Sequence, residues 1–172
     1  MLKIIPTNNE LVMEGDDFIV SKTDLKGRLT YCNEIFIQFA GLSEKELLGQ
    51  YHNIIRHPDM PRSIFKLLWD RIQNKQEVFA YVKNLSADGS YYWVYANVTA
   101  SVDNNNNIIG YYSVRRKPNE KNLEIIKDLY KKLLDTEKHS GIEASTKYLT
   151  EILQQRCISY DEFINNVQNG SL

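Results

Sequence analysis

Three consecutive segments in the second half of the sequence constrain the fold most strongly. Each is rich in β-branched and aromatic residues, and each is separated from the next by a short polar stretch typical of a turn, Asp88-Gly89 and then 103–107. Pro118 ends the last segment because proline cannot donate a ladder hydrogen bond. These features predict three antiparallel strands, which cover residues 78–86, 91–102 and 108–117.

Two shorter β-rich runs come earlier, at residues 18–23 and 29–32, and Gly27 lies in the turn between them. Helical signals fill the interval before the three long strands, and they include an N-cap at Asn33 and a capping box that begins at Ser43. The order is therefore two strands, several short helices and three strands. We predict an α+β fold, with a five-stranded antiparallel sheet that carries short helices on one face.

The chain divides into three parts by pattern. Residues 1–17 are predicted to form an N-terminal cap, residues 18–118 a sheet-containing domain, and residues 119–172 a helical C-terminal extension. Gly141 interrupts the helical periodicity of this extension, so we expect three helices. They are too few to form a core of their own, and we expect them to dock on the domain, on each other or on a partner.

Composition excludes several classes of function. The formal net charge is −1, which argues against a nucleic-acid-binding surface, and no apolar run is long enough for insertion into a membrane. The N-terminus lacks a signal peptide, and Cys32 and Cys157 lie far apart, so we expect a cytoplasmic protein without a metal site.

The stretch from His52 to Pro61 is the strongest candidate for a binding site. It contains two of the three histidines of the chain together with an arginine, an aspartate and two prolines. Prolines stiffen a loop, and stiff polar loops commonly carry binding groups. A structural interpretation is equally open from the residues alone, because Asp59 could cap the next helix and His57 could be a hydrogen-bonded turn residue.

The order of elements and several residues resemble the Aer-type PAS domain of bacterial aerotaxis receptors over residues 18–117. Lys75 departs from the resemblance, because family members often have glycine there. We expect a chain without the membrane anchor and signalling tail of such receptors, similar in this to the free-standing CetB-type PAS proteins of two-protein energy-taxis systems. The matching residues are His52-Asn53, 56–61, Phe65, Trp69, 82–84, Asp88-Gly89, 92–94 and 96–98.

The resemblance implies a redox or energy-taxis sensor that binds FAD and signals by contact with a membrane-bound receptor-like protein of the HAMP/methyl-accepting type. That partner would hold it at the inner membrane. Asn84 is then expected to meet the edge of the flavin, although it could also be a turn residue, and Trp69 is expected to be a core residue with one edge in the pocket. The implied cofactor-binding residues are Arg56, His57, Asp59, Asn84, Trp69, Asn33 and His52.

Two alternatives stay open. One is a haem-binding PAS gas sensor with His57 or His52 as axial ligand, and the other is an interaction module without a cofactor. An enzyme is not expected, because the sequence has no nucleophile signature, no Gly-x-Gly-x-x-Gly motif and no P-loop. Covalent flavin photochemistry is not expected either, since neither cysteine falls in a helix beside the predicted pocket.

Strand alternation predicts which side chains share a face of the sheet. If Asn84 points inward, so do the smaller residues of the fourth strand, which would form the pocket floor: Tyr92, Val94, Ala96, Val98 and Ala100. The opposite face would carry an aromatic set to which we assign Tyr91, Trp93, Tyr95, Tyr81 and Tyr111. An aromatic face of this size is expected to be buried against another segment or another protein. We expect the N-terminal cap, the receptor partner or a second copy (a homodimer through Tyr91, Trp93 and Tyr95), unless the chain's own terminal helices cover it.

Overall fold

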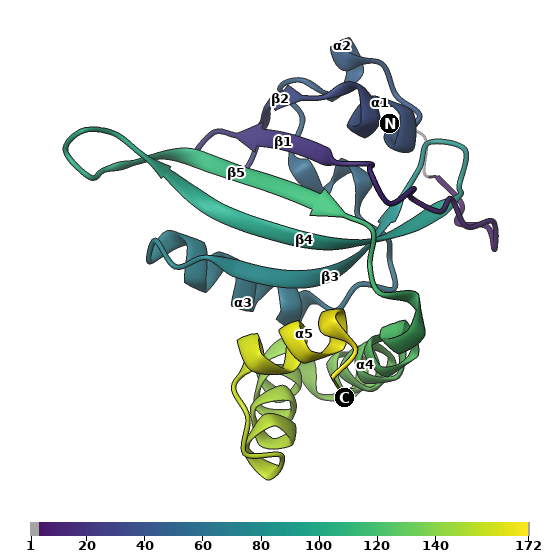
Figure 1. Ribbon diagram of the computed structural model, residues 1–172, viewed down its shortest axis with the longest axis vertical. Helices are drawn as coiled ribbons and strands as arrows, with labels where there is room; N and C mark the ends of the chain where they lie inside the picture. The colour runs from purple at the N-terminus through teal and green to yellow at the C-terminus, as the bar shows by residue number, and fades with distance from the viewer. Residues whose placement is uncertain (1–3, 172) are drawn as a thin grey trace.

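The computed structural model describes residues 4–171, and its centre is one antiparallel sheet of five strands in the order β2-β1-β5-β4-β3 (Figure 1). The predicted α+β architecture is confirmed. The strands are β1 Ile19–Thr23, β2 Leu29–Cys32, β3 Val78–Leu85, β4 Tyr91–Val102 and β5 Ile108–Arg116.

Four short helical elements connect β2 to β3, and local sequence signals define their ends. The side chain of Asn33 accepts a hydrogen bond from the Phe36 N–H, and Gly41 adopts the left-handed conformation that ends α1. Ser43 and Glu46 form the predicted capping box of α2. The elements are α1 Glu34–Ala40, α2 Glu44–Leu47, the 3₁₀ helix η1 His52–Ile55 and α3 Arg62–Gln73.

The strand register fixes the two faces of the sheet. Val82 pairs with Val94, and Ala96 pairs with both Ala80 and Arg115, so these side chains share the inner face. The prediction for Tyr111 is wrong, because Tyr111 pairs with Ala100 and therefore lies on the inner face. A register shift between Ser101 and Val102 accompanies the hairpin that joins β4 to β5.

The C-terminal helices cover the outer face of β3 and β4. Helix α4 spans Leu123–Gln155 with a non-helical residue at Gly141, and α5 spans Tyr160–Asn169. The hydroxyl of Tyr81 donates to Gln168 at 2.7 Å, and the hydroxyl of Tyr95 donates to Asn165 at 2.7 Å. The tail therefore docks on the sheet through tyrosine hydroxyls as well as apolar contact.

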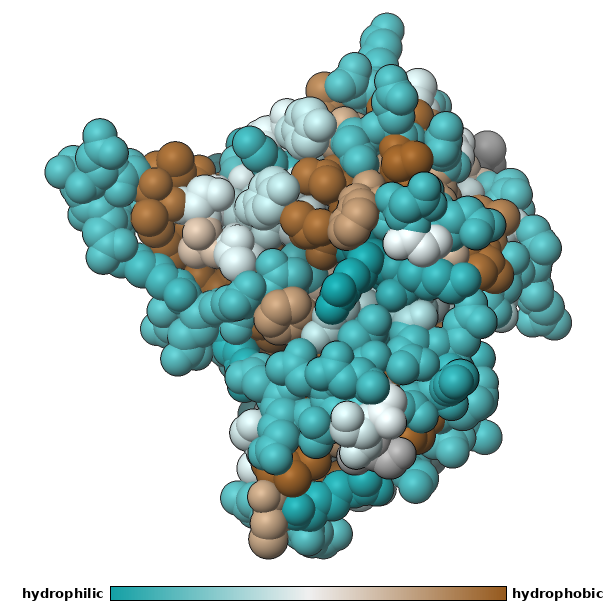
Figure 2. All heavy atoms as spheres, viewed as in Figure 1, coloured by the Kyte–Doolittle hydropathy of each residue, from teal (hydrophilic) through white to brown (hydrophobic). Residues whose placement is uncertain are grey.

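This docking shows which segments bury the aromatic face of the sheet. Trp93 and Tyr95 are only 7% and 2% exposed, and the ring centroid of Trp93 lies 6.1 Å from that of Tyr130 in α4. The predicted homodimer through Tyr91, Trp93 and Tyr95 is contradicted, because the chain's own segments already bury this surface. On the face shown in Figure 2, hydrophilic residues dominate the surface of the tail, and apolar residues gather nearer the sheet.

The N-terminal segment crosses the start of β4. The Thr7 N–H donates to Gly89 O at 2.8 Å, and the Leu11 N–H donates to Tyr91 O at 2.8 Å. Gly89 has a φ of +89°, and a Cβ there would approach the Ile5 carbonyl oxygen to 2.4 Å. The turn therefore requires glycine. None of the helices within residues 4–171 combines the length and apolar character needed to cross a bilayer.

Candidate functional site

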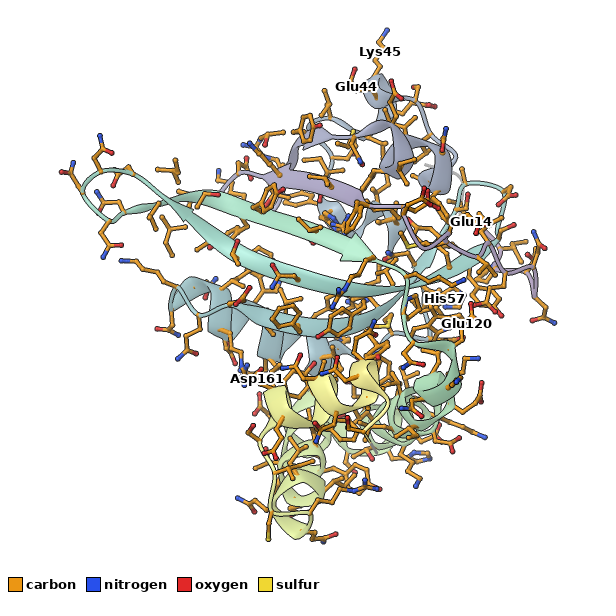
Figure 3. All side chains as sticks on the ribbon, viewed as in Figure 1. Glu14, Glu44, Lys45, His57, Glu120 and Asp161 are labelled. Carbon is orange, nitrogen blue, oxygen red and sulfur yellow. The ribbon has the colours of Figure 1, made fainter. Side chains whose placement is uncertain are left out.

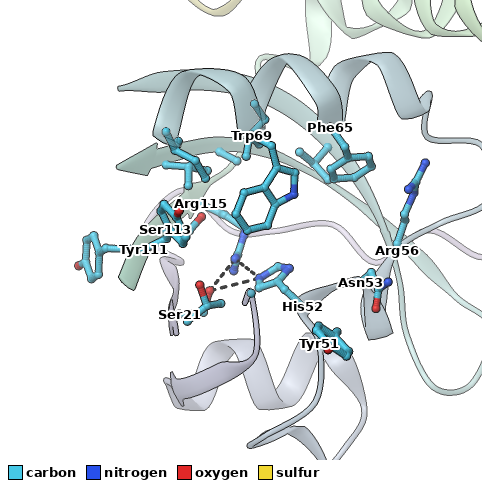
Figure 4. Close-up of a pocket in the computed structure, with 18 of the residues that line it drawn as sticks. Ser21, Tyr51, His52, Asn53, Arg56, Phe65, Trp69, Tyr111, Ser113 and Arg115 are labelled. Carbon is cyan, nitrogen blue, oxygen red and sulfur yellow. Dashed lines mark hydrogen bonds between the residues drawn. The ribbon is translucent and has the colours of Figure 1, made fainter. Parts of the chain in front are cut away.

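A cavity of about 350 Å³ lies between α3, η1 and the inner face of the sheet (Figure 4). Its volume falls in the range of small-molecule sites, and its composition also fits one, because most of its walls are apolar with a few polar groups between them. The apolar and aromatic lining consists of Phe65, Leu68, Trp69, Ile72, Val82, Ala96, Val98 and Tyr111.

Arg115 provides a buried cation in this lining. Its side chain is 3% exposed, and its Nη2 donates to Ser21 Oγ at 2.7 Å and to Nε2 of His52. Its Nη1 is buried without a hydrogen-bond partner among residues 4–171. Burial lowers the pKa of Arg115 to about 10, which leaves it charged at neutral pH. A buried charge with a free donor is costly unless a ligand satisfies it.

His52 supports Arg115 as a neutral imidazole. Burial and the nearby charge of Arg115 lower the pKa of His52 to about 3. Because a guanidinium can only donate, Nε2 of His52 must be the acceptor, and the ring proton must therefore lie on Nδ1. The predicted site residue His52 thus lies in the cavity, where it positions Arg115 (Figure 4).

Two further polar groups of the lining lack partners. Nδ2 of Asn84 and Oγ of Ser113 are buried, and neither has a hydrogen-bond partner within the described part of the chain. Asn84 is 3% exposed and belongs to β3, which Arg56 joins through an isolated backbone bridge. The cavity therefore presents an amide donor, a hydroxyl and a guanidinium to whatever enters it.

Arg56 lies in the lining, as predicted. Its guanidinium stacks on the ring of Phe65 at 4.3 Å, and its Nη2 donates to Met60 O at 2.9 Å. Lys26 and Tyr51 also line the cavity and are exposed, so this side opens to solvent. The mouth consequently carries positive charge that can meet an anionic group.

Three of the seven predicted residues lie outside the cavity lining. Nδ1 of His57 accepts from the Asp59 N–H at 3.1 Å, and the Asp59 carboxylate pairs with Lys83 at 2.8 Å. Burial and the charge of Lys83 lower the pKa of His57 to about 4. The carboxamide of Asn33 is occupied as the cap of α1 and by bonds to β1. Nε2 of His57 is buried without a hydrogen-bond partner in residues 4–171, whereas the side chains of Asp59 and Asn33 are held by protein contacts.

Sequence reasoning missed Ser21, Ser113 and Arg115. Arg115 is followed by Arg116 at the end of a strand, and such a pair resembles an exposed charged terminus. The alternation rule could have separated them, because Arg115 shares its face with Ala96, whereas Arg116 lies 5.1 Å from the ring of Tyr95 on the other face.

The geometry does not favour haem ligation. His57 lies outside the lining, and Nε2 of His52 is bonded to Arg115. Neither Cys32 nor Cys157 lines the cavity. No group of three or more potential metal-binding side chains comes together in residues 4–171.

The fold and the cavity define a class of protein, a small α+β domain with a cavity between its sheet and its short helices. A family model described as "PAS fold" matches residues 29–115, which is 87 of the 172 residues. The chain belongs to the PAS family.

Two curated proteins are similar in sequence to this chain. The chain is 35% identical over 127 residues to the aerotaxis receptor of Escherichia coli (strain K12), covering 74% of this chain and 25% of the receptor. It is 25% identical over 105 residues to the nitrogen fixation regulatory protein of Klebsiella pneumoniae, covering 61% of this chain and 21% of that protein. The chain thus spans about a quarter or less of the length of these curated relatives.

A solved light-oxygen-voltage domain, studied with a flavin analogue, superposes with a TM-score of 0.57 at 19% identity. The match covers 64% of this chain and 83% of that domain. At this identity the likeness concerns the fold alone.

Proposed function

We propose that this chain is a redox sensor that binds FAD in the cavity and signals by contact with a chemoreceptor-like protein. The observation that carries the proposal is a cavity whose buried donors, Asn84 Nδ2 and Arg115 Nη1, lack partners in residues 4–171. The resemblance to Aer-type PAS domains and the 35% identity to an aerotaxis receptor support a flavin over other ligands.

The residues fit a flavin. The aromatic and aliphatic walls, with Trp69 and Phe65 on α3, suit a flat ring system, and the unpartnered donors suit its carbonyl and nitrogen acceptors. Arg56 and Lys26 at the mouth suit a diphosphate. When bound, FAD would supply the redox chemistry, and the protein would supply binding, orientation and charge.

Helix α3 offers a route from the cavity to the tail. It presents Trp69 to the cavity, while the N–H groups of Arg62 and Ser63 donate to the Glu137 carboxylate of α4 at 3.0 and 2.7 Å. Oγ of Ser63 lies 2.9 Å from Oγ of Ser145, also in α4. A change at the cavity that favours a different position of α3 would therefore alter how α4 packs.

The far end of α3 is tied to the second tail helix. Arg71 forms an ion pair with Asp161. Asp161 lies at the start of α5 (Figure 3). Both ends of α3 thus contact the C-terminal extension, one through the Glu137 carboxylate and the other through the Arg71–Asp161 ion pair. Within residues 4–171, no other element that lines the cavity makes two charged contacts of this kind with the extension. We infer that the tail, rather than the buried aromatic face, carries the signal.

The partner in this proposal is a membrane-bound protein of the HAMP/methyl-accepting type, as in CetB-type systems, and the chain itself is cytoplasmic and held near the inner membrane by that contact. A cytoplasmic HAMP-containing fragment of such a receptor is the probe. With FAD bound, its affinity for the chain should differ at least fivefold between oxidised and dithionite-reduced protein. If the fragment bound the oxidised and reduced protein with equal affinity, or bound neither, the proposal that the chain signals by contact with such a receptor would be overturned.

A further inference from the structure

The charge of Arg115 is not balanced inside the protein. No carboxylate lies within ion-pair distance of Arg115 in residues 4–171, although the more exposed Arg28 and Arg71 are paired. Its side-chain partners, Ser21 and His52, are neutral. Its guanidinium also lies 5.3 Å from the ring of Phe36, which adds no full charge.

The whole cavity shares this imbalance. Its ionisable lining residues come from the β1–β2 turn, η1 and its flanks, and β5, and no aspartate or glutamate is among those described: Lys26, Tyr51, His52, Arg56, Tyr111, Tyr112 and Arg115. Tyr92 of β4 interacts with Arg115, and burial raises the pKa of its phenol, so it also stays neutral. A ligand inside therefore experiences a net positive environment that water screens poorly at its deep end.

We propose that Arg115 selects the state of the bound flavin that carries negative charge, so that the pocket binds reduced FAD as its anion more tightly than oxidised FAD. This inference rests on the proposed function and deepens it by naming the residue that sets the ligand's redox bias. The free Nη1 donor and the unbalanced charge have the same requirement, an acceptor with negative charge.

The bias has two measurable consequences. Tighter binding of the reduced state raises the midpoint potential of bound FAD, since each tenfold difference in affinity shifts a two-electron potential by about 30 mV. In addition, reduction to the anion takes up two electrons and one proton, whereas reduction to the neutral form takes up two electrons and two protons. The protein thereby changes the dependence of the potential on pH.

The first test compares variants by dithionite titration of FAD-loaded protein against a reference dye. Arg115→Met should lower the midpoint by at least about 30 mV, equal to a tenfold loss of preference for the reduced state. Arg115→Lys, which keeps the charge, should retain most of the wild-type potential. Arg116→Met is the matched control, because Arg116 is adjacent but lies on the other face, and its potential should equal that of the wild type.

A second measurement needs only the wild-type protein, so it holds even where the Arg115 variants fail to fold. The midpoint is followed with pH in mildly acidic buffer, below the pH at which free reduced flavin loses its N1 proton. The anion predicts a slope of about 30 mV per pH unit, and the neutral form predicts about 59 mV.

The outcomes separate the two proposals. A protein that binds FAD with the steeper slope, or an Arg115→Met variant that binds FAD with an unchanged potential, overturns the role of Arg115 and leaves the flavin sensor intact. A wild-type protein that binds no FAD overturns the proposed function, and the role of Arg115 toward a flavin with it.

Discussion

Arg115 donates a hydrogen bond from its buried guanidinium to the neutral imidazole of His52, which lies 63 positions earlier in the chain. The bond joins β5 to η1 across the wall of the cavity. It places a charged donor and a pH-sensitive acceptor side by side, so the stability of the fold should depend on the protonation of one histidine.

The pH dependence of stability tests this state of His52. Its folded pKa of about 3 lies below its ordinary value of 6.5, so the unfolded chain binds the proton first and stability is lost as pH falls below 6.5. Between pH 7 and pH 5, His52 should account for a loss of about 2 kcal/mol in the free energy of unfolding. Urea denaturation at the two pH values measures it.

His52→Gln isolates the contribution, because glutamine keeps an acceptor for Arg115 and does not titrate. His57 adds a loss of the same sign, since its pKa is also lowered, to about 4, and this part should remain in the variant. If His52→Gln lost as much stability as the wild type over this range, the pKa of His52 would not be lowered in the fold.

Asn84 should contribute to affinity for FAD but not to folding. Asn84→Ala removes a buried amide donor that has no partner in residues 4–171, so the unfolding free energy should stay within about 1 kcal/mol of the wild type. Affinity for FAD should fall about tenfold, the equivalent of one hydrogen bond. Quenching of FAD fluorescence reports the affinity.

Asn97→Ala is the control for this change. It also shortens an asparagine, but one that donates to Glu77 from the other face of the sheet. It should leave the affinity unaltered, and an equal loss in both variants would argue against ligand contact by Asn84.

The turn from His52 to Pro61 should divide into residues that contact FAD and residues that do not. Arg56 lines the cavity mouth, whereas the side chain of Asp59 is 62% exposed and pairs with Lys83. Arg56→Met should therefore weaken FAD binding about tenfold, the order expected for one charge-assisted bond. Asp59→Asn should change it less than about twofold, because exposed ion pairs contribute little. Isothermal titration compares them, and the reverse order would favour direct contact by Asp59.

Glu137 should couple the cavity to the tail. Glu137→Gln removes the carboxylate that accepts from the first N–H groups of α3, at a cost of about 1 kcal/mol. Hydrogen exchange in α4 should accelerate, and the effect of FAD on that exchange should shrink. Glu151→Gln, at an exposed position of the same helix, should do neither. Unchanged coupling in Glu137→Gln would exclude α3 as the route.

Much of the scaffold could be predicted because its signals are local. Strand alternation, the Asn33 cap, the Ser43 capping box and the break at Gly141 each depend on a few neighbouring residues. Lys75, where the resemblance implies a glycine, adopts a positive φ of 60°, a conformation that glycine adopts readily.

The site was harder to predict because it depends on register between distant segments. The face on which Tyr111 and Arg115 lie follows from the pairing of β4 with β5, and the register shift near Ser101 cannot be located from alternation alone. The motif predicts His57 as a site residue, and in the structure its ring lies outside the cavity lining, with its centroid 6.0 Å from that of Tyr91. The motif identifies the turn, but which of its residues line the cavity follows only from the tertiary structure.

The most direct test of the account asks whether FAD occupies this cavity. Wild-type protein titrated with FAD should bind one equivalent, with quenched flavin fluorescence and induced visible circular dichroism. Val98→Phe, which fills the cavity from its lining, should abolish these signals, whereas Thr99→Phe, one residue along on the opposite face, should preserve them. A wild-type protein that stays colourless in excess FAD, or equal binding by Val98→Phe, would contradict the account.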